Sequence, residues 1–295
     1  MLRPVAQKPD SSAAVRRAYG TVLNTLGFVQ LVTNRYDEAV STLESSLAAY
    51  RSIDGLTQDA DAMARFGQSA SWQVNALVAL GRNEEARRVG EEGREAATRV
   101  LERHPTHMTA LRARGLVNSS LSDIAGSEMR RVDAVTLSEA SGSDWSTLVK
   151  VDPANAIAWN NLANSRTSTA GSLFAAGRPR DALAAALRNE DLVPIAEKLR
   201  FPSPIMVYTF SFAAFIAAEL GDARAAGRLL ETTWRMARPL LDRLQPGSFE
   251  RESLELRLLS RSMYTADRAG DAAAARKFGA GVAERLAALK PPVES

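Results

Sequence analysis

The chain has 295 residues, of which 45% are hydrophobic and 24% charged, so it can bury a sizeable core and is unlike a disordered protein. Its 37 basic residues nearly balance its 34 acidic ones. They are interspersed, as in 82–88, so the concentrated basic stripe of a nucleic-acid binder is missing. There is no cysteine, which excludes disulfides and thiolate chemistry. No run of about 18 apolar residues predicts a membrane span.

Residues 1–12 have the composition of a flexible linker. They contain no apolar stretch of the kind that a signal peptide needs, so we expect a cytoplasmic protein. The linker-like start leaves open whether the chain is a piece of a longer protein with a further domain upstream.

Internal repeats organise the rest of the chain. Pro105 and Pro153 lie 48 residues apart, and Ala110 and Ala158 share that offset. An alanine that we expect at a helix contact recurs at similar intervals, at Ala39, Ala86, Ala134, Ala182, Ala226 and Ala275. These positions predict six units of about 44–49 residues.

Each unit reads as a helix, a short polar turn and a second helix. Gly81, Gly177, Gly221 and Gly270 stand where a left-handed residue would end the first helix. Acidic residues follow, where they favour the start of the next helix, and Pro179 is tolerated in such a first turn. The abundant alanine also favours helices, so the sequence predicts an all-α fold.

Several segments interrupt this pattern. Residues 207–212 alternate like a strand but run directly into a helical stretch, so we expect helix there. Gly142 and its neighbouring serines predict a break or kink at 141–143. We expect loops at 199–204 and at 246–247, and a frayed tail over 291–295.

The segment 151–163 carries a family resemblance. After Asp152-Pro153, the residues Trp159, Leu162 and Ala163 stand where tetratricopeptide repeats have their Trp, Leu and small residue. Leu23, Leu26 and Gly27 fill those places in the first unit. The chain therefore resembles tetratricopeptide-repeat (TPR) proteins. This resemblance implies one domain over residues 13–290, a right-handed α-solenoid of about six antiparallel helix pairs.

The repeats are longer than the family's period of about 34 residues. From Trp159 to Ala182 the distance is 23 residues, about two helical turns more than the family's pattern. An insertion of two turns lengthens the first helix of the pair without rotating its buried face. Long repeats of this kind resemble the TPR-like tails of bacterial signalling proteins.

Motifs that carry catalytic chemistry are missing from the sequence. There is no phosphate-binding Gly-rich Lys loop, no HExxH and no GxSxG. The two histidines, His104 and His107, flank Pro105, and we expect them to serve a turn rather than a metal. We therefore expect no enzyme, no cofactor and no metal site.

The resemblance implies that the first helices line a concave groove that binds a partner. The residues that it places in this groove are Asn24, Phe28, Arg112, Asn160, Asn164, Thr167, Tyr208, Phe215, Arg257 and Tyr264. An asparagine amide both donates to and accepts from a peptide backbone, although ordinary helix–helix contacts would also use it. The lysines of a carboxylate clamp are missing, which argues against a ligand held by its C-terminal carboxylate.

A second candidate surface is the aromatic cluster of Tyr208, Phe210, Phe212 and Phe215. It is either core or an apolar surface that binds a partner.

We interpret the chain as a scaffold that binds a protein or peptide, with no nucleic acid and no membrane insertion. The main alternative is the regulatory or sensor tail of a bacterial signalling protein, a kinase or transcription regulator, which binds a small molecule or an upstream effector domain. An enzyme on a helical scaffold and a nucleic-acid binder are further alternatives.

Overall fold

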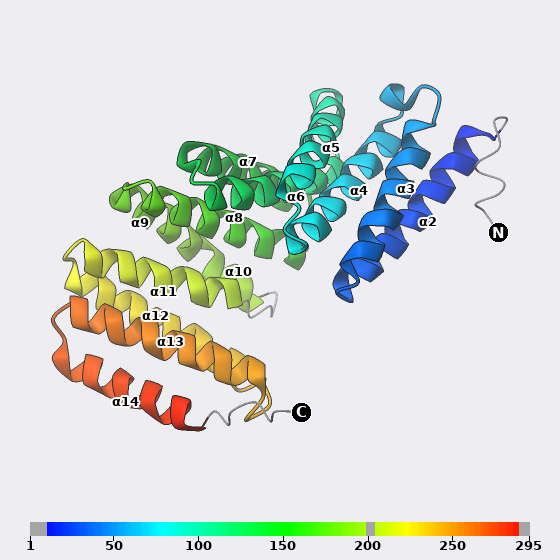
Figure 1. Cartoon of the computed structure of the whole chain (residues 1–295). Helices are drawn as coiled ribbons and strands as arrows, with labels where there is room; N and C mark the ends of the chain where they lie inside the picture. The colour runs from blue at the N-terminus through cyan, green and yellow to red at the C-terminus, as the bar shows by residue number, and fades with distance from the viewer. Residues whose placement is uncertain (1–10, 199–203, 289–295) are drawn as a thin grey trace. The chain divides into compact units, whose positions relative to one another are not determined.

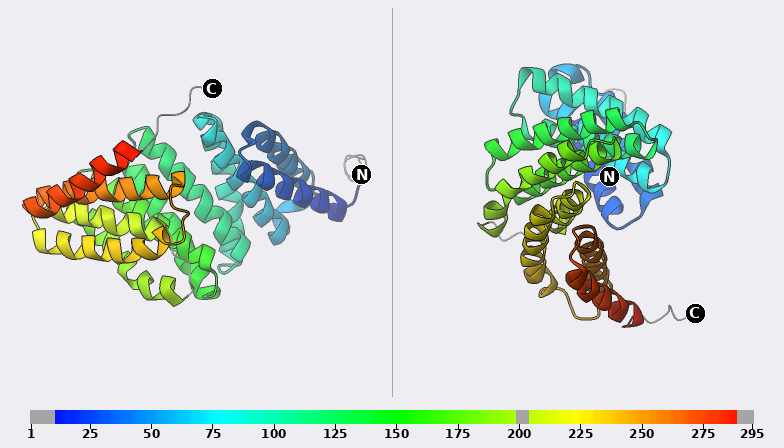
Figure 2. Two further views of the ribbon diagram at one scale, coloured as in Figure 1. Left: turned by 90° about the horizontal axis from the view of Figure 1, so that it is seen from below. Right: turned by 90° about the vertical axis from the view of Figure 1, so that its left-hand side faces the viewer.

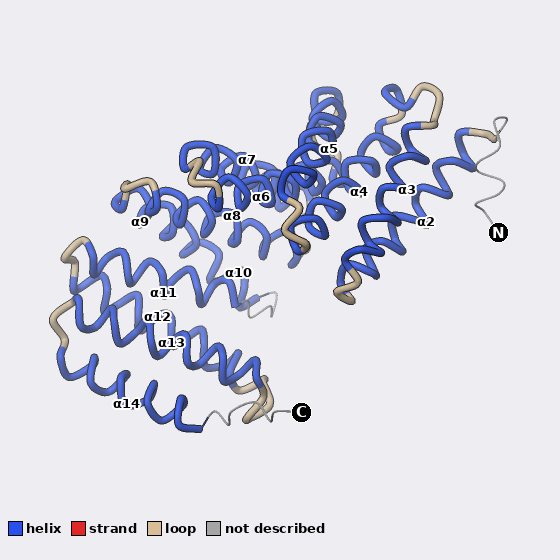
Figure 3. Tube along the Cα trace, in the orientation of Figure 1, coloured by secondary structure: helices blue, strands red, loops and turns tan. Residues whose placement is uncertain are grey.

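The structure is a computed structural model, and it describes residues 11–198 and 204–288 (Figure 1). Most of the expected N-terminal linker and the expected frayed tail therefore lie outside the described residues. So do residues 199–203 of the loop expected over 199–204, and Pro204 is the first residue of a helix. Within the described ranges the chain forms helices and turns and no strand (Figure 3). The all-α prediction is confirmed.

The helices follow one another along the chain in pairs. Their bounds are α2 (Ala13–Val32), α3 (Tyr36–Arg51), α4 (Ala60–Ala79), α5 (Asn83–Arg103), α6 (Met108–Ser127), α7 (Arg131–Val151), α8 (Ala156–Ala175), α9 (Pro179–Leu187), α10 (Val193–Lys198), α11 (Pro204–Glu219), α12 (Ala223–Leu241), α13 (Phe249–Arg268) and α14 (Ala272–Ala288). Five first helices, α2, α4, α6, α11 and α13, pack on the second helix that follows each of them, and α9 packs on α11 (Figure 2).

The first helices of the pairs begin at near-constant intervals, at residues 13, 60, 108, 156, 204 and 249. Among them α2, α4, α6, α8 and α13 are each 20 residues long. The expected lengthening of the first helix is thus confirmed, and it recurs in most of the pairs.

The turn inside each pair has the same backbone geometry. The second residue after each first helix is left-handed, and the N–H of the residue that follows it donates to the carbonyl five residues back, as Arg82 N–H does to Leu77 at 2.9 Å. Four of the six left-handed residues are glycines, while Asn34 and Met129 adopt positive φ at 60° and 64°. A helix-ending turn therefore follows each first helix.

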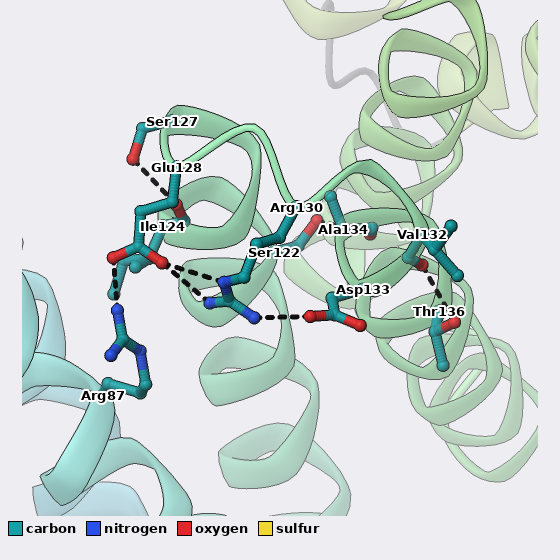
Figure 4. A network of polar contacts seen from close by, with 10 residues as sticks. All are labelled: Arg87, Ser122, Ile124, Ser127, Glu128, Arg130, Val132, Asp133, Ala134 and Thr136. Carbon is teal, nitrogen blue, oxygen red and sulfur yellow. Dashed lines mark hydrogen bonds and ion pairs between the residues drawn. The ribbon is translucent and has the colours of Figure 1, made fainter. Parts of the chain in front are cut away.

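The third of these turns carries a network of charged side chains (Figure 4). Glu128 pairs with Arg130 at 2.9 Å and with Arg87 of α5, and Arg130 also pairs with Asp133 of α7 at 2.6 Å. This network ties the N-terminal end of α5 to the turn that leads into α7. Since the side chains are partly exposed, we expect it to orient the helices more than to stabilise them.

The core rests on small residues that let helices approach closely. Five of the six repeating alanines, from Ala39 to Ala226, are at most 1% exposed, while Ala275 in the last pair is half-buried. Glycines make the same contact elsewhere, and a Cβ at Gly27 would lie 2.5 Å from Leu43 Cγ. The repeating positions found in the sequence are therefore the helix contacts.

One sequence prediction is wrong. Helix α7 runs unbroken from Arg131 to Val151, through the expected break at 141–143. Ser141 is fully buried, and its hydroxyl donates to the carbonyl of Gly115 at 2.8 Å. A partner on the neighbouring helix thus outweighs the weak helix propensity of this stretch. The expected helix over 207–212 lies within α11, and the expected turn at Gly247 has φ of 77°.

The chain divides into two compact units, Met1–Ser168 and Thr169–Ser295. The single domain expected over residues 13–290 stays a prediction. Among the described residues, no helix is both long and apolar enough to cross a membrane.

Candidate functional site

The clearest candidate site lies in the second unit, between the first helices α11 and α13. The two helices pack on each other, and two pairs of residues 49 positions apart in the sequence contact each other across them. Arg257 Nη1 donates to Tyr208 Oη at 2.8 Å, and the rings of Phe215 and Tyr264 have centroids 5.5 Å apart. The structure thus brings together four of the residues that were expected in the groove lined by the first helices of the pairs. The surface that these helices share is called the first-helix face.

These four residues line one pocket of about 610 Å³, together with Leu256 and Arg261. The aromatic rings and Leu256 give it apolar walls. Arg257 and Arg261 supply two guanidinium groups, and no carboxylate is among the described residues that line it. A pocket with apolar walls and unopposed positive charge favours a ligand that has an apolar part beside an anionic group.

Arg261 is the residue that defines the charge of this pocket. Burial lowers the pKa of its guanidinium, and the neighbouring Tyr208 partly opposes that shift. The guanidinium lies over the ring of Phe212, with its carbon 5.8 Å from the ring centroid. It has no carboxylate partner in residues 11–198 and 204–288, although partly buried charges are usually paired.

Next to the pocket, Phe215 belongs to a cluster of three phenylalanine rings. Phe174 of α8 lies 5.4 Å from Phe215 and 5.8 Å from Phe212, measured between ring centroids. Phe210 is fully buried on another face of α11. The aromatic cluster expected from the sequence therefore divides into core, at Phe210, and pocket wall, at Tyr208 and Phe215.

At the far side of the pocket, Tyr264 is held by a polar contact. Its hydroxyl donates to Glu219 Oε1 at 3.1 Å, and Arg268 Nε donates to the same oxygen at 2.8 Å. Glu219 thereby raises the pKa of the Tyr264 hydroxyl, so the phenol stays neutral at physiological pH. The ring is fixed in place, and about half of the residue remains exposed.

In the first unit, two of the predicted residues contact side chains of the next first helix, α4. Asn24 is only 3% exposed, and its Nδ2 donates to Gln68 Oε1 at 3.2 Å. The ring of Phe28 contacts that of Trp72, with centroids 4.5 Å apart and the ring planes tilted by 34°. Both partners lie 44 residues further along the chain. This separation is close to the length of one repeat, so the repeat length could have indicated both contacts.

The remaining predicted residues are not gathered at a pocket by any contact that the structure resolves. Arg112 of α6 is half-buried, and its Nε forms no hydrogen bond within the described chain. On α8, Asn160 and Asn164 are half-buried, and the Thr167 hydroxyl donates to the carbonyl of Ala163 at 2.7 Å. Their role in binding stays a prediction.

The two histidines lie at the turn before α6. His107 Nδ1 accepts a hydrogen bond from the Ala110 N–H at 3.3 Å, which caps the helix, and its Nε2 lies 3.1 Å from Asp61 Oδ1. The expected turn role of His107 is confirmed. In the part of the chain that the structure describes, no three His, Asp or Glu side chains are placed to hold a metal ion.

The repeating pairs and their helix contacts define the class: this chain is a TPR-like helical repeat protein. A solved structure, described as a kinesin light chain of Podosopora anserina with nearly identical TPR-like repeats, is similar to it with a TM-score of 0.52 and 18% sequence identity. The similarity covers 73% of this chain and 93% of that one. No protein-family model and no curated protein matches the sequence. At this identity the likeness shows the fold alone.

Proposed function

We propose that this protein is a scaffold that binds a protein or peptide partner on its first-helix face. The pocket between α11 and α13 serves as the anchor site. One observation carries the proposal: Tyr208, Phe215, Arg257 and Tyr264 line a single pocket. This pocket also contains the partly buried Arg261, which has no carboxylate partner among the described residues.

The chemistry of the pocket selects the bound segment. Phe215 and Tyr264 offer ring faces to an apolar or aromatic side chain, and such rings frequently dominate the affinity of an interface. Arg257 and Arg261 can donate to a carboxylate in a geometry that lysine does not match. The proposed ligand is therefore a peptide segment with an apolar side chain next to an acidic one.

A binding assay on the intact chain tests this proposal. A fluorescent peptide array with paired apolar and acidic residues is scanned for ligands, and the affinity of the best is measured by anisotropy. The double variant Phe215→Ala/Arg257→Ala is expected to weaken binding by about tenfold or more, since it removes an aromatic anchor and a charged hydrogen bond.

The control carries the same two substitutions outside the pocket. Phe249 is 80% exposed and Arg224 is exposed, and neither lines the pocket. The variant Phe249→Ala/Arg224→Ala is expected to bind as the original chain does. Equal affinity of the two double variants would overturn the assignment of the site.

A small-molecule sensor is the second candidate. The volume of about 610 Å³ falls within the range of pockets that hold small ligands, and the lining would suit an aromatic or aliphatic acid. Titration of the chain with such an acid, alone and in competition with the bound peptide, distinguishes the peptide-binding scaffold from the small-molecule sensor. An acid that binds this pocket when no tested peptide does would favour the sensor.

A further inference from the structure

An apolar stripe runs along the outer side of α2, the first helix that the structure describes (Figure 1). Val22, Leu26 and Val29 are separated by four and three residues, so they share one side of the helix. Each is between 46% and 51% exposed. We call these three residues the end stripe. The opposite side of α2 packs on α3, where Gly27 lies against Leu43.

The surroundings of the end stripe are apolar and uncharged. Five of the fifteen exposed large hydrophobic side chains among the described residues belong to α2, and residues 18–34 contain no charged side chain. Soluble monomers rarely gather apolar side chains in one exposed patch. In repeat proteins the outer face of a terminal repeat is usually polar, because solubility requires it. The end stripe therefore has the character of an interface.

The same positions are buried in the first helices that follow. Helices α2, α4 and α6 begin at residues 13, 60 and 108, and alignment of these starts gives the equivalents of the end stripe. They are Ser69, Gln73 and Ala76 in α4, and Val117, Leu121 and Ile124 in α6. All six are at most 5% exposed. In α2 these positions are exposed, and no helix pair precedes α2 in the described chain.

The second helix of the preceding pair covers these buried positions. Ser69 Oγ lies 3.0 Å from Ser46 Oγ of α3. Leu121 packs over Gly90 of α5, so that a Cβ on this glycine would lie 3.0 Å from Leu121 Cδ2. Since Leu26 is the equivalent of Leu121, the element that fits the end stripe is a second helix with a small residue opposite Leu26.

Helix α14, the last helix that the structure describes, has such a residue at the matching position. With the start of α14 aligned on that of α5, Gly279 takes the place of Gly90. A Cβ on Gly90 would meet Val74 of its own pair and Leu121 of the next, whereas one on Gly279 would meet only Met263 of its own pair among the described residues. The space that Leu121 fills over Gly90 is thus open over Gly279.

The surfaces of α14 and α2 are complementary in size and in charge. Ala280 and Ala283, beside Gly279, are exposed, small and neutral, so they can face the uncharged end stripe without desolvation of an ionised group. A contact of α2 with α2 of another copy would instead set Leu26 against side chains as large as its own. The pairing with α14 also continues the interface that already joins α3 to α4 and α5 to α6.

We propose that copies of this chain associate head to tail, with α2 of one copy packed on α14 of the next and Leu26 over Gly279. This contact uses different surfaces on the two copies. It leaves a free end stripe on one copy and a free α14 on the other, so association continues beyond a dimer unless the ends close into a ring. The end stripe is separate from the pocket between α11 and α13.

Sedimentation velocity of the full chain over a series of concentrations tests the association. The average mass should rise with concentration. The variant Val22→Lys/Val29→Lys should weaken self-association by about tenfold or more, because two charges would enter an apolar contact. The matched control is Val132→Lys/Val151→Lys, which alters two exposed valines of α7 in the same unit and should associate as the original chain does.

Chemical unfolding separates loss of the contact from loss of the fold. Lysine has a higher helix propensity than valine, and all four valines are exposed, so both double variants should retain the free energy of unfolding of the original chain at low concentration. The proposal is overturned if the original chain stays monomeric at every concentration, or if the two double variants associate equally.

Crosslinking identifies the surfaces in contact. The chain has no cysteine, so an introduced thiol reports one position. A short bismaleimide should join Leu26→Cys chains to Ala283→Cys chains in a mixture, and it should join neither variant to itself. Crosslinking of Leu26→Cys to itself, or none in the mixture, would overturn the head-to-tail contact. The Phe215→Ala/Arg257→Ala variant should associate normally, so the outcome does not depend on the peptide site.

Discussion

Gly93 of α5 provides the sharpest test of how tightly the helix pairs pack. A Cβ built at Gly93 would lie 2.5 Å from the Cβ of Ala70 on α4, closer than two such atoms approach in folded proteins. Ala70 is fully buried and has no flexible side chain to move aside. The substitution Gly93→Ala therefore requires the two helix backbones to separate.

Two opposing effects set the magnitude of this change. Overpacking of a close-packed core costs about 1–3 kcal/mol. Replacing a glycine inside a helix by alanine stabilises the helix by up to about 1 kcal/mol. Because the contact joins two Cβ atoms on fixed backbones, we expect overpacking to dominate. The free energy of unfolding should fall by about 1–2 kcal/mol.

Urea unfolding followed by circular dichroism measures this change, and two controls isolate its cause. Gly227 lies inside α12 with no atom within 4 Å of its would-be Cβ, so Gly227→Ala should stabilise by about 0.5–1 kcal/mol. In an Ala70→Gly background, Gly93→Ala should become neutral or stabilising, since the opposing Cβ is gone. If Gly93→Ala were as stabilising as Gly227→Ala, the close approach of α4 and α5 would be refuted.

Two further predictions use the same unfolding measurement. Met129 adopts positive φ and is 69% exposed. Glycine has no Cβ to strain in this conformation, so Met129→Gly should raise the free energy of unfolding by about 1 kcal/mol. No change would mean that the turn is not left-handed. Arg114→Met should lower it by about 2–3 kcal/mol at neutral pH, because Asp144 stays buried without its partner. Burial raises the pKa of Asp144, so the folded chain binds more protons than the unfolded chain and stability falls as pH rises through that window. Arg114→Met should extend this fall to higher pH, and a pH profile parallel to that of the original chain would contradict it.

The sequence by itself determined the repeat and its local geometry. Recurring alanines, helix-ending glycines and alternating charge predict helix pairs, because each depends on contacts within a few residues or on a period of the chain. The helix over 207–212 followed from its continuity with the next apolar stretch. The same local reasoning failed at 141–143, where Ser141 takes its hydrogen-bond partner from α6.

Tertiary structure alone decided which candidate residues meet. The resemblance to TPR proteins implied that Tyr208 and Arg257 line one groove. It could not show that Arg261 joins them without a carboxylate partner among the described residues. Contacts that repeat with a fixed period can be predicted from the sequence. The partners of a buried polar or charged group cannot, because they depend on how the neighbouring helices pack.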